Sequence, residues 1–339
     1  MKRRSVWFAA PFAAEVREAP APTPGPGEAL VRTLVSAVSP GSELLVYRGQ
    51  APEDAAVDDT IAALGGQFRF PIQYGYAAVG HVIRVGADVP KAWLGRLVFA
   101  FNPHESHFVA PVAALMPLPE DLAPDAAVFL PTMETAVSFV MDGRPVIGEQ
   151  VAVLGQGIVG LLTTALLAEL PLTALVALDG YPLRREWSRR LGATAALEPA
   201  ALIEARRALQ GDREYAGADL TYELSGNPRA LDAAIALTGY NGRIVVGSWY
   251  GRKRVEVDLG GAFHRAHMQI TGSQVSHLAP QWLGRWTKPR RLAVAWEMLG
   301  RHRPERLITH RFPLEEAAEA YRLLDESPGE TVQVVFKYE

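Results

Sequence analysis

The stretch 151-VAVLGQGIVG-160 decides the fold of this chain. It begins inside the apolar run QVAVL (150–154), which predicts a buried strand, and it opens the apolar run IVGLLTTALLAEL (158–170), which predicts a helix. A glycine pattern is informative when it joins a strand to a helix in this way. Three glycines with the spacing G-x-G-x-x-G occupy the junction: Gly155, Gly157 and Gly160.

Each of these glycines has a separate expected role. Gly155 permits a tight turn after the strand, and Gly157 lets a pyrophosphate approach the backbone. Gly160 lets the new helix pack close to the sheet. The phosphates would bind beside the backbone of Ile158 and Val159, where the free N–H groups and the dipole of the helix N-terminus favour an anion. The sequence therefore predicts a dinucleotide site, the alternative being a plain glycine-rich turn.

An acidic residue, Asp179, ends the next predicted strand, nineteen residues after Gly160. An acid at this place accepts hydrogen bonds from the ribose hydroxyls of a dinucleotide. It would repel a 2′-phosphate, so it favours NAD(H) over NADP(H). Arg184, which we also assign to the cofactor site, and Arg185 follow and weaken this preference. The alternative role of Asp179 is to cap the helix that follows.

The two halves of the chain differ in pattern. Residues 1–130 are rich in proline, glycine and short β-like runs, and one segment, 51–66, predicts a short helix. From about residue 148, six short strands alternate with helices, which indicates a doubly wound parallel sheet. A helix and a last strand, TVQVVFKY (331–338), close the chain. The predicted fold class is α/β.

The composition bounds the partners of the protein. A chain of 339 residues with 49% hydrophobic content favours two domains over one. The formal net charge of −3 offers no field that attracts nucleic acid or anionic lipid, and no segment approaches the roughly 20 apolar residues of a membrane span. The absence of cysteine excludes disulfides and thiolate metal sites. We expect a soluble, cytoplasmic protein with no nucleic-acid or membrane partner.

These motifs resemble the medium-chain dehydrogenase/reductase superfamily, whose best-known members are zinc alcohol dehydrogenases. The resemblance rests on PGPGEALVR (24–32), IGEQVAVLGQGIVG (147–160), RRLGATAAL (189–197), ELSGNPRALDAAI (223–235) and THRFPLEEAAEAYRLLD (309–325). It implies a GroES-like, β-rich catalytic domain formed by residues 1–130 with 273–339, and a Rossmann domain formed by 131–272. It also implies that nicotinamide and a small-molecule substrate meet in a cleft between these domains.

The positions that bind zinc in this superfamily lack metal-binding side chains here. Where zinc members carry Cys-x-Thr/Ser-Asp, this chain has Pro40-Gly41-Ser42-Glu43. Where they carry Gly-His-Glu, it has Gly75-Tyr76-Ala77, and the third ligand position falls near Leu130. Proline and leucine cannot bind zinc, and a phenol is a poor substitute for imidazole. The resemblance therefore implies a member that binds no zinc.

A second histidine pattern, HESH (104–107), offers a weaker metal hypothesis. It lacks the helical H-E-x-x-H spacing, and residues three apart on a strand point to opposite faces. We expect His104 and His107 to be exposed loop histidines instead. Glu134 could also reach the pocket, but the sequence shows no partner ligand for it.

Hydroxyl groups are the expected substitutes for zinc. Ser42 matches the hydroxyl that relays the substrate proton, and the resemblance places the Tyr76 phenol in the cleft, where both could stabilise an oxyanion. Glu43 and Glu134 are candidate orienters or proton shuttles. Two alternatives stay open: Tyr76 fills the vacated metal cavity, and Glu43 is a capping or domain-bridging carboxylate. The latter is the reading that we favour for Glu43.

The ends of the later Rossmann strands complete the expected cofactor site. The resemblance places LSGNP (224–228) and VGSWYG (246–251) beside the adenosine and nicotinamide, and GSQ (272–274) beside the nicotinamide. The residues assigned on this basis are Ser225, Gly226, Gly247, Ser248 and Ser273.

The leading hypothesis is a zinc-independent, NAD(H)-dependent oxidoreductase acting on an alcohol/carbonyl pair. The turns SPGSE (39–43) and YGYAAVG (74–80) also resemble, more weakly, the bacteriochlorophyllide hydroxyethyl dehydrogenase group of the superfamily. One alternative is an NADPH-dependent reductase of enone or quinone C=C bonds, which Asp179 disfavours. Another is a non-catalytic NAD(H)-binding sensor. By family habit we expect a homodimer or homotetramer.

Overall fold

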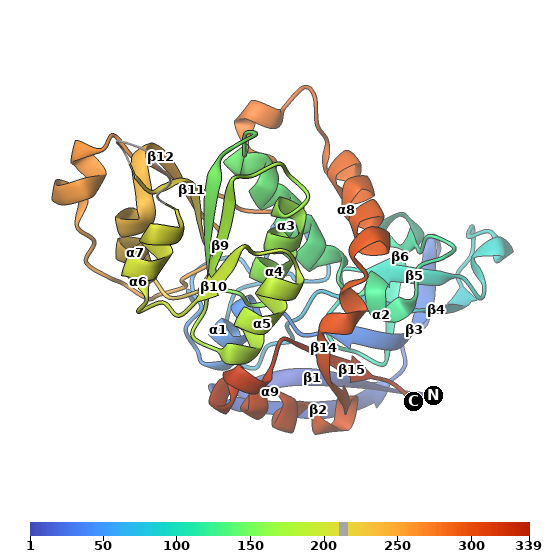
Figure 1. Cartoon of the computed structure of the whole chain (residues 1–339). Coiled ribbons are helices and arrows are strands. Elements are labelled where there is room, and N and C mark those ends of the chain that lie inside the picture. The colour runs from blue at the N-terminus through green and yellow to red at the C-terminus, as the bar shows by residue number, and fades with distance from the viewer. Residues whose placement is uncertain (210–215) are drawn as a thin grey trace. The chain divides into compact units, whose positions relative to one another are not determined.

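The computed structural model describes residues 1–209 and 216–339 (Figure 1). Within these residues the chain forms two compact units, which we call unit 1 and unit 2 and describe separately. Unit 1 consists of Met1–Pro131 and Trp296–Glu339, and unit 2 consists of Thr132–Ala295.

The observed units differ from the expected domains in residues 273–295, which pack with unit 2. Ser273 Oγ donates to Asp142 Oδ2 at 2.5 Å. The buried Arg291 forms an ion pair with Glu134. Both acceptors lie in unit 2, so these polar contacts hold the segment there. Local sequence patterns do not encode such long-range contacts, which is why the boundary differs from the one expected.

Unit 1 contains a mixed sheet of seven strands and a separate antiparallel hairpin. The sheet strands are β3 (Glu28–Ala37), β4 (Ala78–Val85), β5 (Leu97–Ala100), β6 (His107–Pro111), β7 (Met116–Pro117), β14 (Ile308–Pro313) and β15 (Gln333–Lys337). The hairpin strands are β1 (Lys2–Ala10) and β2 (Ala13–Pro20). Neighbours follow the order β14-β15-β3-β4-β5-β7, and β6 pairs with β3. The β-rich first part of the chain and its C-terminal strand are thus confirmed.

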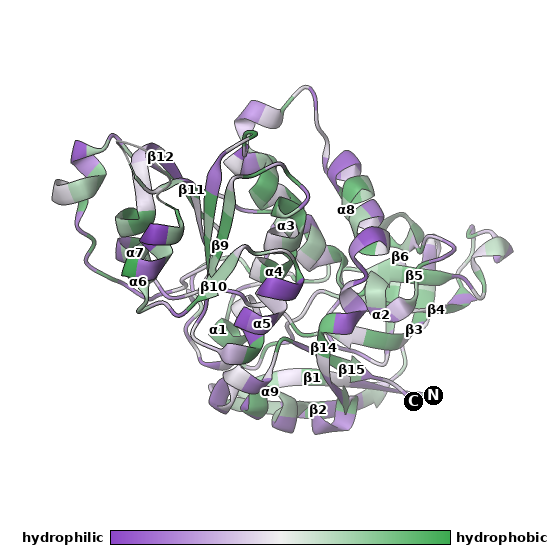
Figure 2. Ribbon diagram, in the orientation of Figure 1, coloured by the Kyte–Doolittle hydropathy of each residue, from purple (hydrophilic) through white to green (hydrophobic). Residues whose placement is uncertain are grey.

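Four helices accompany these strands in the described part of unit 1 or run into it. They are α1 (Pro40–Tyr47), α2 (Pro124–Ala127), α9 (Ala317–Glu326) and the end of α8 (Lys288–His302). Helix α8 carries both hydrophilic and hydrophobic residues (Figure 2).

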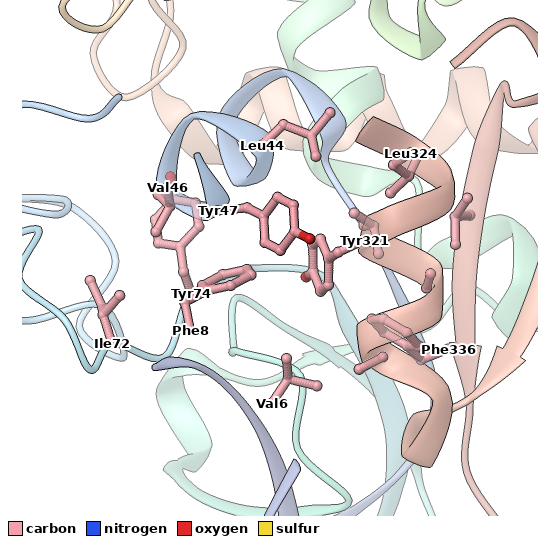
Figure 3. Packing of buried hydrophobic residues seen from close by; sticks show 14 of the residues in the cluster. Val6, Phe8, Leu44, Val46, Tyr47, Ile72, Tyr74, Tyr321, Leu324 and Phe336 are labelled. Atoms are coloured by element: carbon pink, nitrogen blue, oxygen red, sulfur yellow. The ribbon is translucent and has the colours of Figure 1, made fainter. Parts of the chain in front are cut away.

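One core cluster of unit 1 joins α1 and α9 to the strands β1 and β15 (Figure 3). Tyr47 of α1 and Tyr321 of α9 stack with their ring centroids 5.6 Å apart. Phe8 and Phe336 are completely buried beside them. Burying one such side chain contributes about 1.5–3 kcal/mol, so this cluster holds the second half of α1, from Leu44 to Tyr47, in place.

Residues 51–66 form turns, so the short helix expected there was wrong. The Asp58 carboxylate accepts hydrogen bonds from the backbone N–H of Thr60 at 2.6 Å and of Ile61 at 2.9 Å. Such side-chain bonds compete with helical backbone bonds and stabilise a turn. A bridge between Ala56 and Gln67 also closes the segment on itself.

Unit 2 contains a parallel sheet of six strands in the order β10-β9-β8-β11-β12-β13. The strands are β8 (Gln150–Leu154), β9 (Ala174–Leu178), β10 (Ala195–Leu197), β11 (Ala218–Glu223), β12 (Thr238–Val246) and β13 (Gln269–Gly272). The strand order reverses between β8 and β11, which is the place where doubly wound sheets bind ligands. The predicted α/β fold, a GroES-like β-rich part plus a Rossmann sheet, is confirmed.

The helices of unit 2 follow the expected alternation. They are α3 (Leu130–Gly143), which begins at the boundary, α4 (Ile158–Leu167), α5 (Pro182–Arg190), α6 (Leu202–Ala208), α7 (Ala230–Leu237) and the first part of α8. Among the residues that the structure describes in either unit, no helix combines the length and the apolar character needed to cross a membrane.

Candidate functional site

The glycine-rich junction between β8 and α4 has the geometry of a dinucleotide loop. Gly155 has a φ of +90°, and a Cβ built on it would lie 2.5 Å from the backbone nitrogen of Ser225. A Cβ on Gly160 would collide with the carbonyl oxygen of Gly155. The tight turn and the close helix packing expected of these two glycines are therefore present.

Gly157, the middle glycine, faces open space. Among residues 1–209 and 216–339, no heavy atom beyond its chain neighbours and its own helix backbone lies within 4 Å of the position that its Cβ would take. Gly157 is also the N-cap residue of α4, and as a glycine it has no side chain to cap the N–H groups of that helix end. Open backbone beside uncapped N–H groups fits a pyrophosphate, which the amides of Ile158 and Val159 would bind. This binding stays a prediction.

Asp179 lies beside this loop with 6% of its surface exposed. Its Oδ2 accepts a hydrogen bond from the backbone N–H of Gln156 at 2.7 Å, and its Oδ1 accepts one from Tyr181 N–H at 2.9 Å. The carboxylate therefore braces the loop, a role that sequence reasoning missed. Each carboxylate oxygen has a second lone pair, so the group can still accept from a ribose.

Two arginines flank Asp179. The Arg184 guanidinium lies 4.8 Å from the centre of the Tyr181 ring, and burial lowers its pKa although Asp179 and Tyr181 oppose this shift. Arg185 donates to the carbonyl oxygen of Asp179 at 2.9 Å and also pairs with Glu198. Positive charge thus lies close to the expected ribose site, together with the acid.

Gln156, which lies between the first two glycines, is a further structural residue that sequence reasoning missed. It is completely buried, and its Oε1 accepts hydrogen bonds from Thr164 of α4 and Ser188 of α5, both at 3.0 Å. Its Nε2 donates to the carbonyl oxygen of Val153. The sequence did hold a signal for this role: Gln156 is the one polar side chain between two glycines in an otherwise apolar stretch.

The loops after β11 and β12 are cross-linked by the completely buried Glu223. Its Oε1 accepts from the backbone N–H of Ser225 at 2.8 Å and from the Ser225 hydroxyl, and its Oε2 accepts from Tyr250 at 2.5 Å. Ser248 Oγ accepts from Gly226 N–H at 2.9 Å. Burial raises the pKa of Tyr250, and Glu223 raises it further.

These contacts bring four of the expected cofactor residues together. Ser225, Gly226 and Ser248 lie in the two cross-linked loops, and Gly247 N–H donates to the Glu223 carbonyl oxygen at 3.0 Å. Because the Gly155 backbone touches Ser225, the cluster adjoins the glycine-rich loop. Sequence reasoning missed Glu223 and Tyr250.

Ser273, the last expected cofactor residue, is engaged elsewhere in unit 2. Its hydroxyl donates to Asp142, and its backbone N–H donates to the Val246 carbonyl oxygen at 2.9 Å. The structure does not join it to the glycine-rich loop by any hydrogen bond among the described contacts.

In unit 1, the two hydroxyls expected to replace zinc lie together. Ser42 Oγ and Tyr76 Oη are 2.8 Å apart, and Ser42 Oγ also donates to the Ser39 carbonyl oxygen at 3.4 Å. Ser42 lies in the first turn of α1, which Pro40 begins, and Tyr76 precedes β4. This pairing brings residues 34 positions apart into contact.

Burial and neighbouring hydroxyls set the protonation of this pair. Burial raises the pKa of Tyr76, whereas hydrogen bonds with Ser39 and Ser42 lower it less strongly. Tyr74 lies 5.9 Å from Tyr76 between ring centroids, and burial also holds its pKa well above the usual range. Both phenols are therefore neutral at pH 7 and available as proton donors.

Glu43, expected as an orienter or shuttle with capping as the favoured alternative, does cap its helix. Its Oε1 accepts from the Ser39 backbone N–H at the start of α1, at 2.6 Å. Its Oε2 accepts from Tyr321 at 2.5 Å and faces His104 Nε2 at 3.0 Å. The carboxylate has no exposed surface, so it does not face solvent.

His104 and His107 are both buried, so the expectation of exposed loop histidines was wrong. His104 Nδ1 lies 2.7 Å from Ser36 Oγ, and His107 Nδ1 lies 3.1 Å from Ser106 Oγ. Burial lowers the pKa of His107. The reason for the error is that β6 pairs with β3, and Glu105 in the preceding loop forms a bridge with Ser5 of β1; local polarity does not predict these long-range pairings.

Glu134 has a partner that sequence reasoning missed. Arg291, 157 residues later, donates to Glu134 Oε1 from Nε at 3.1 Å and from Nη2 at 2.9 Å, and it also donates to Ser138 Oγ. Burial raises the pKa of Glu134, although Arg291 opposes this shift. The carboxylate therefore anchors α8 within unit 2 through a buried ion pair.

The donor set of the described residues does not fit zinc. No group of three or more His, Cys, Asp or Glu side chains able to hold a metal ion occurs within residues 1–209 and 216–339. The positions that the resemblance aligns with zinc ligands carry Pro40 and Tyr76, and the third falls near the completely buried Leu130. By contrast, the open backbone at Gly157 fits a dinucleotide.

Comparison with known proteins shows which families the chain is similar to. Residues 159–288 match the family described as zinc-binding dehydrogenase. The L-threonine 3-dehydrogenase of Pyrococcus horikoshii is 23% identical over 356 residues, which cover 96% of this chain and 95% of that protein.

Solved structures show the same fold at low identity. An alcohol dehydrogenase of Escherichia coli CFT073 in complex with NADH has a TM-score of 0.77 and 20% identity, covering 99% of both chains. A protein of Sinorhizobium meliloti 1021 bound to NADP, described as a zinc-binding dehydrogenase, has a TM-score of 0.77 and 19% identity, also over 99% of both chains. These comparisons support the resemblance of the chain to the medium-chain dehydrogenase/reductase superfamily.

Proposed function

We propose that this protein is a zinc-independent, NAD(H)-dependent oxidoreductase that acts on a small-molecule alcohol/carbonyl pair. The observation that carries the proposal is the Ser42–Tyr76 pair, with its oxygens 2.8 Å apart. In this superfamily the same two sequence positions supply a relay hydroxyl and a zinc ligand. A pair of hydroxyls there offers hydrogen-bond donors in place of the metal.

The cofactor preference rests on Asp179. Its carboxylate adjoins the glycine-rich loop, and its remaining lone pairs can accept from ribose hydroxyls. A 2′-phosphate would meet this negative charge, although Arg184 and Arg185 offset part of the repulsion. The relatives bind NADH or NADP, so Asp179 is the feature that favours NAD(H) here.

The acid–base chemistry belongs to the hydroxyl pair. NAD(H), held by the glycine-rich loop and Asp179, would supply hydride transfer to or from the carbon of the alcohol/carbonyl pair. In the direction of reduction, Tyr76 donates its phenolic proton to the carbonyl oxygen, and the Ser42 hydroxyl stabilises the phenolate that forms. Water then restores the proton. Burial raises the pKa of Tyr76, so the phenol carries the proton that this step needs at neutral pH.

A substrate class follows from the relatives. The P. horikoshii protein is named for oxidation of L-threonine at carbon 3, which is a secondary alcohol. We infer that the substrate of this protein is a secondary alcohol or the corresponding ketone.

The first test is a fluorescence titration of chelator-treated protein with NADH and, separately, with NADPH. We expect NADH to bind more tightly by about tenfold or more, which corresponds to ~1.4 kcal/mol. A panel of secondary alcohols that includes L-threonine, and the matching ketones, then tests turnover, with added zinc as the comparison. Activity that needs added zinc would overturn zinc independence. NADPH-dependent loss of enone absorbance, or NADH binding without turnover on any member of the panel, would favour the reductase or sensor alternatives.

A further inference from the structure

Glu43 and His104 form a buried pair that the proposed chemistry leaves unused. Their side chains have no exposed surface, and His104 Nε2 lies 3.0 Å from Glu43 Oε2. Burying a carboxylate and an imidazole is costly unless every polar atom has a partner. The pair therefore needs a structural or functional reason to occur at this place in unit 1.

The Glu43 carboxylate is held from three segments of the chain. Ser39 N–H at the start of α1 donates to Oε1 at 2.6 Å, Tyr321 of α9 donates to Oε2 at 2.5 Å, and His104 approaches from the loop before β6. Figure 3 shows Tyr321 reaching from α9 toward α1. Because Ser42 immediately precedes Glu43 in the first turn of α1, fixing the carboxylate fixes the position of Ser42.

The same imidazole also rests against the backbone that carries Tyr76. Gly75 has a φ of +124°, and a Cβ built on it would lie 2.6 Å from His104 Nε2. The ring therefore occupies the space beside the Gly75 Cα, directly before Tyr76. The His104 side chain thus contacts both segments that carry the hydroxyl pair. It contacts Glu43, which follows Ser42, and Gly75, which precedes Tyr76.

The far side of the ring is held as well. His104 Nδ1 lies 2.7 Å from Ser36 Oγ, and Ser36 Oγ lies 2.7 Å from Tyr338 Oη. The ring edge packs on Phe336, with the centroids 5.0 Å apart. When Nε2 carries the proton toward Glu43, Nδ1 accepts from Ser36 and Ser36 accepts from Tyr338, so each polar atom is satisfied.

We propose that His104 is a positioning residue that, through Glu43 and Gly75, sets the distance between the Ser42 and Tyr76 hydroxyls. This role rests on the proposed function of that pair. A side chain that holds both donors removes the need to order them during the reaction, which is how pre-aimed donors stabilise a developing oxyanion. The contrasting interpretation is that the pair only stabilises the fold.

The test uses variants that keep one contact of the imidazole at a time. His104→Gln keeps a donor at the place of Nε2, and His104→Asn keeps only a group near Nδ1. Glu43→Gln preserves the shape of the carboxylate and removes its charge. The matched control is Glu105→Gln, because Glu105 is a buried acid next to His104 whose carboxylate pairs with Arg3 instead.

The first readout needs no substrate. Full-length protein is produced with 3-fluorotyrosine, and ¹⁹F NMR lines are assigned by Tyr76→Phe, Tyr321→Phe and Tyr338→Phe. We expect His104→Asn and Glu43→Gln to shift or split the Tyr76 line, His104→Gln to restore it largely, and Glu105→Gln to leave it unchanged. Movement of the Tyr321 and Tyr338 lines alone, with Tyr76 unmoved, would overturn the proposal, because that is the result of a purely structural role.

The second readout is steady-state kinetics with the best substrate of the secondary-alcohol panel. His104→Asn is expected to lower kcat by about tenfold, with His104→Gln near the wild-type value and the Kd for NADH unchanged in both. Equal loss in both variants, or loss that appears only in KM, would contradict positioning. If Ser42→Ala and Tyr76→Phe leave turnover unchanged, the proposed function fails instead, and the NMR result still decides whether His104 positions the pair.

Discussion

Gln156 donates its backbone N–H to the Asp179 carboxylate at 2.7 Å, so the acid expected to bind a ribose also holds the glycine-rich loop. One side chain therefore links cofactor choice to loop geometry. A substitution at Asp179 can therefore change both the charge near the ribose site and the hydrogen bonds that hold the loop. A variant that keeps an acceptor but removes the charge tests the first effect.

Asp179→Asn should weaken NADH binding and narrow or reverse the preference over NADPH. The amide retains an acceptor for one backbone N–H but loses the negative charge that repels a 2′-phosphate. We expect the ratio of the two Kd values to shift by about tenfold. The control is Asp219→Asn. Asp219 also accepts a backbone hydrogen bond, from the N–H of Gln150, the first residue of β8, at 2.8 Å. An equal shift in the control would show that the effect is one of stability.

Gly157→Ala and Gly160→Ala should separate binding from folding. A methyl group on Gly157 meets no atom within 4 Å, so the melting temperature should stay close to that of the wild type while NADH affinity falls at least about tenfold. A methyl group on Gly160 collides with the Gly155 carbonyl oxygen, so that variant should lose stability as well. Differential scanning fluorimetry with and without NADH tests both. Unchanged NADH affinity in Gly157→Ala would contradict a pyrophosphate at this position.

Tyr76→Phe and Ser42→Ala should each lower kcat by about 10²–10³-fold, the range for removing one pre-aimed donor or proton-transfer group. The Kd for NADH should not change, because the glycine-rich loop belongs to unit 2. Tyr47→Phe is the comparison, since Tyr47 is a buried tyrosine of the same core cluster that stacks on Tyr321. A fall in kcat for Tyr47→Phe that matches Tyr76→Phe would point to a general packing effect.

Breaking the Glu134–Arg291 pair should be costly, whereas replacing both residues should be less so. Arg291→Met leaves a buried carboxylate without its partner and should lower the free energy of unfolding by about 3–5 kcal/mol. The double variant Glu134→Leu with Arg291→Met should lose less than the sum of the single changes, as measured by urea unfolding. The exposed pair Glu186–Arg190 serves as a control, where Glu186→Gln should cost no more than about 0.5 kcal/mol. Strict additivity at Glu134 and Arg291 would show that they do not interact.

Asp125 should give unit 1 a measurable acid sensitivity. Burial alone would raise its pKa, but Lys337 and Arg311 lower the pKa below the ordinary value of 3.8. A carboxyl with a lowered pKa in the folded state contributes stability above its unfolded pKa and loses it as the pH falls through the folded value. Asp125→Asn should therefore cost about 0.5–1 kcal/mol at neutral pH, and the difference from wild type should shrink as the pH falls below about 4. Asp121→Asn, a change at an exposed site, should show no such trend in thermal melts across pH.

Local patterns were sufficient where the chain interacts with its near neighbours. The strand before Gly155, the helix after Gly157 and the alternating segments up to β13 follow from hydrophobic periodicity and glycine placement. The error at 51–66 has the same origin, since Asp58 bonds to nearby backbone groups that periodicity does not weigh. The sequence also indicated Ser42 and Tyr76 as candidate catalytic residues, although only through resemblance to a family.

The tertiary structure decided which buried polar groups meet. Glu43 faces His104, 61 residues away, Glu134 meets Arg291 after 157 residues, and Glu223 bonds to Tyr250 after a complete helix and strand. The sequence by itself determined the Rossmann motif, the order of the elements and the absence of zinc ligands at the three family positions. Only the folded chain settled the polar partners. The physical reason is that apolar periodicity reports which side of an element is buried, whereas a buried charge is stable only beside a partner that the topology brings to it.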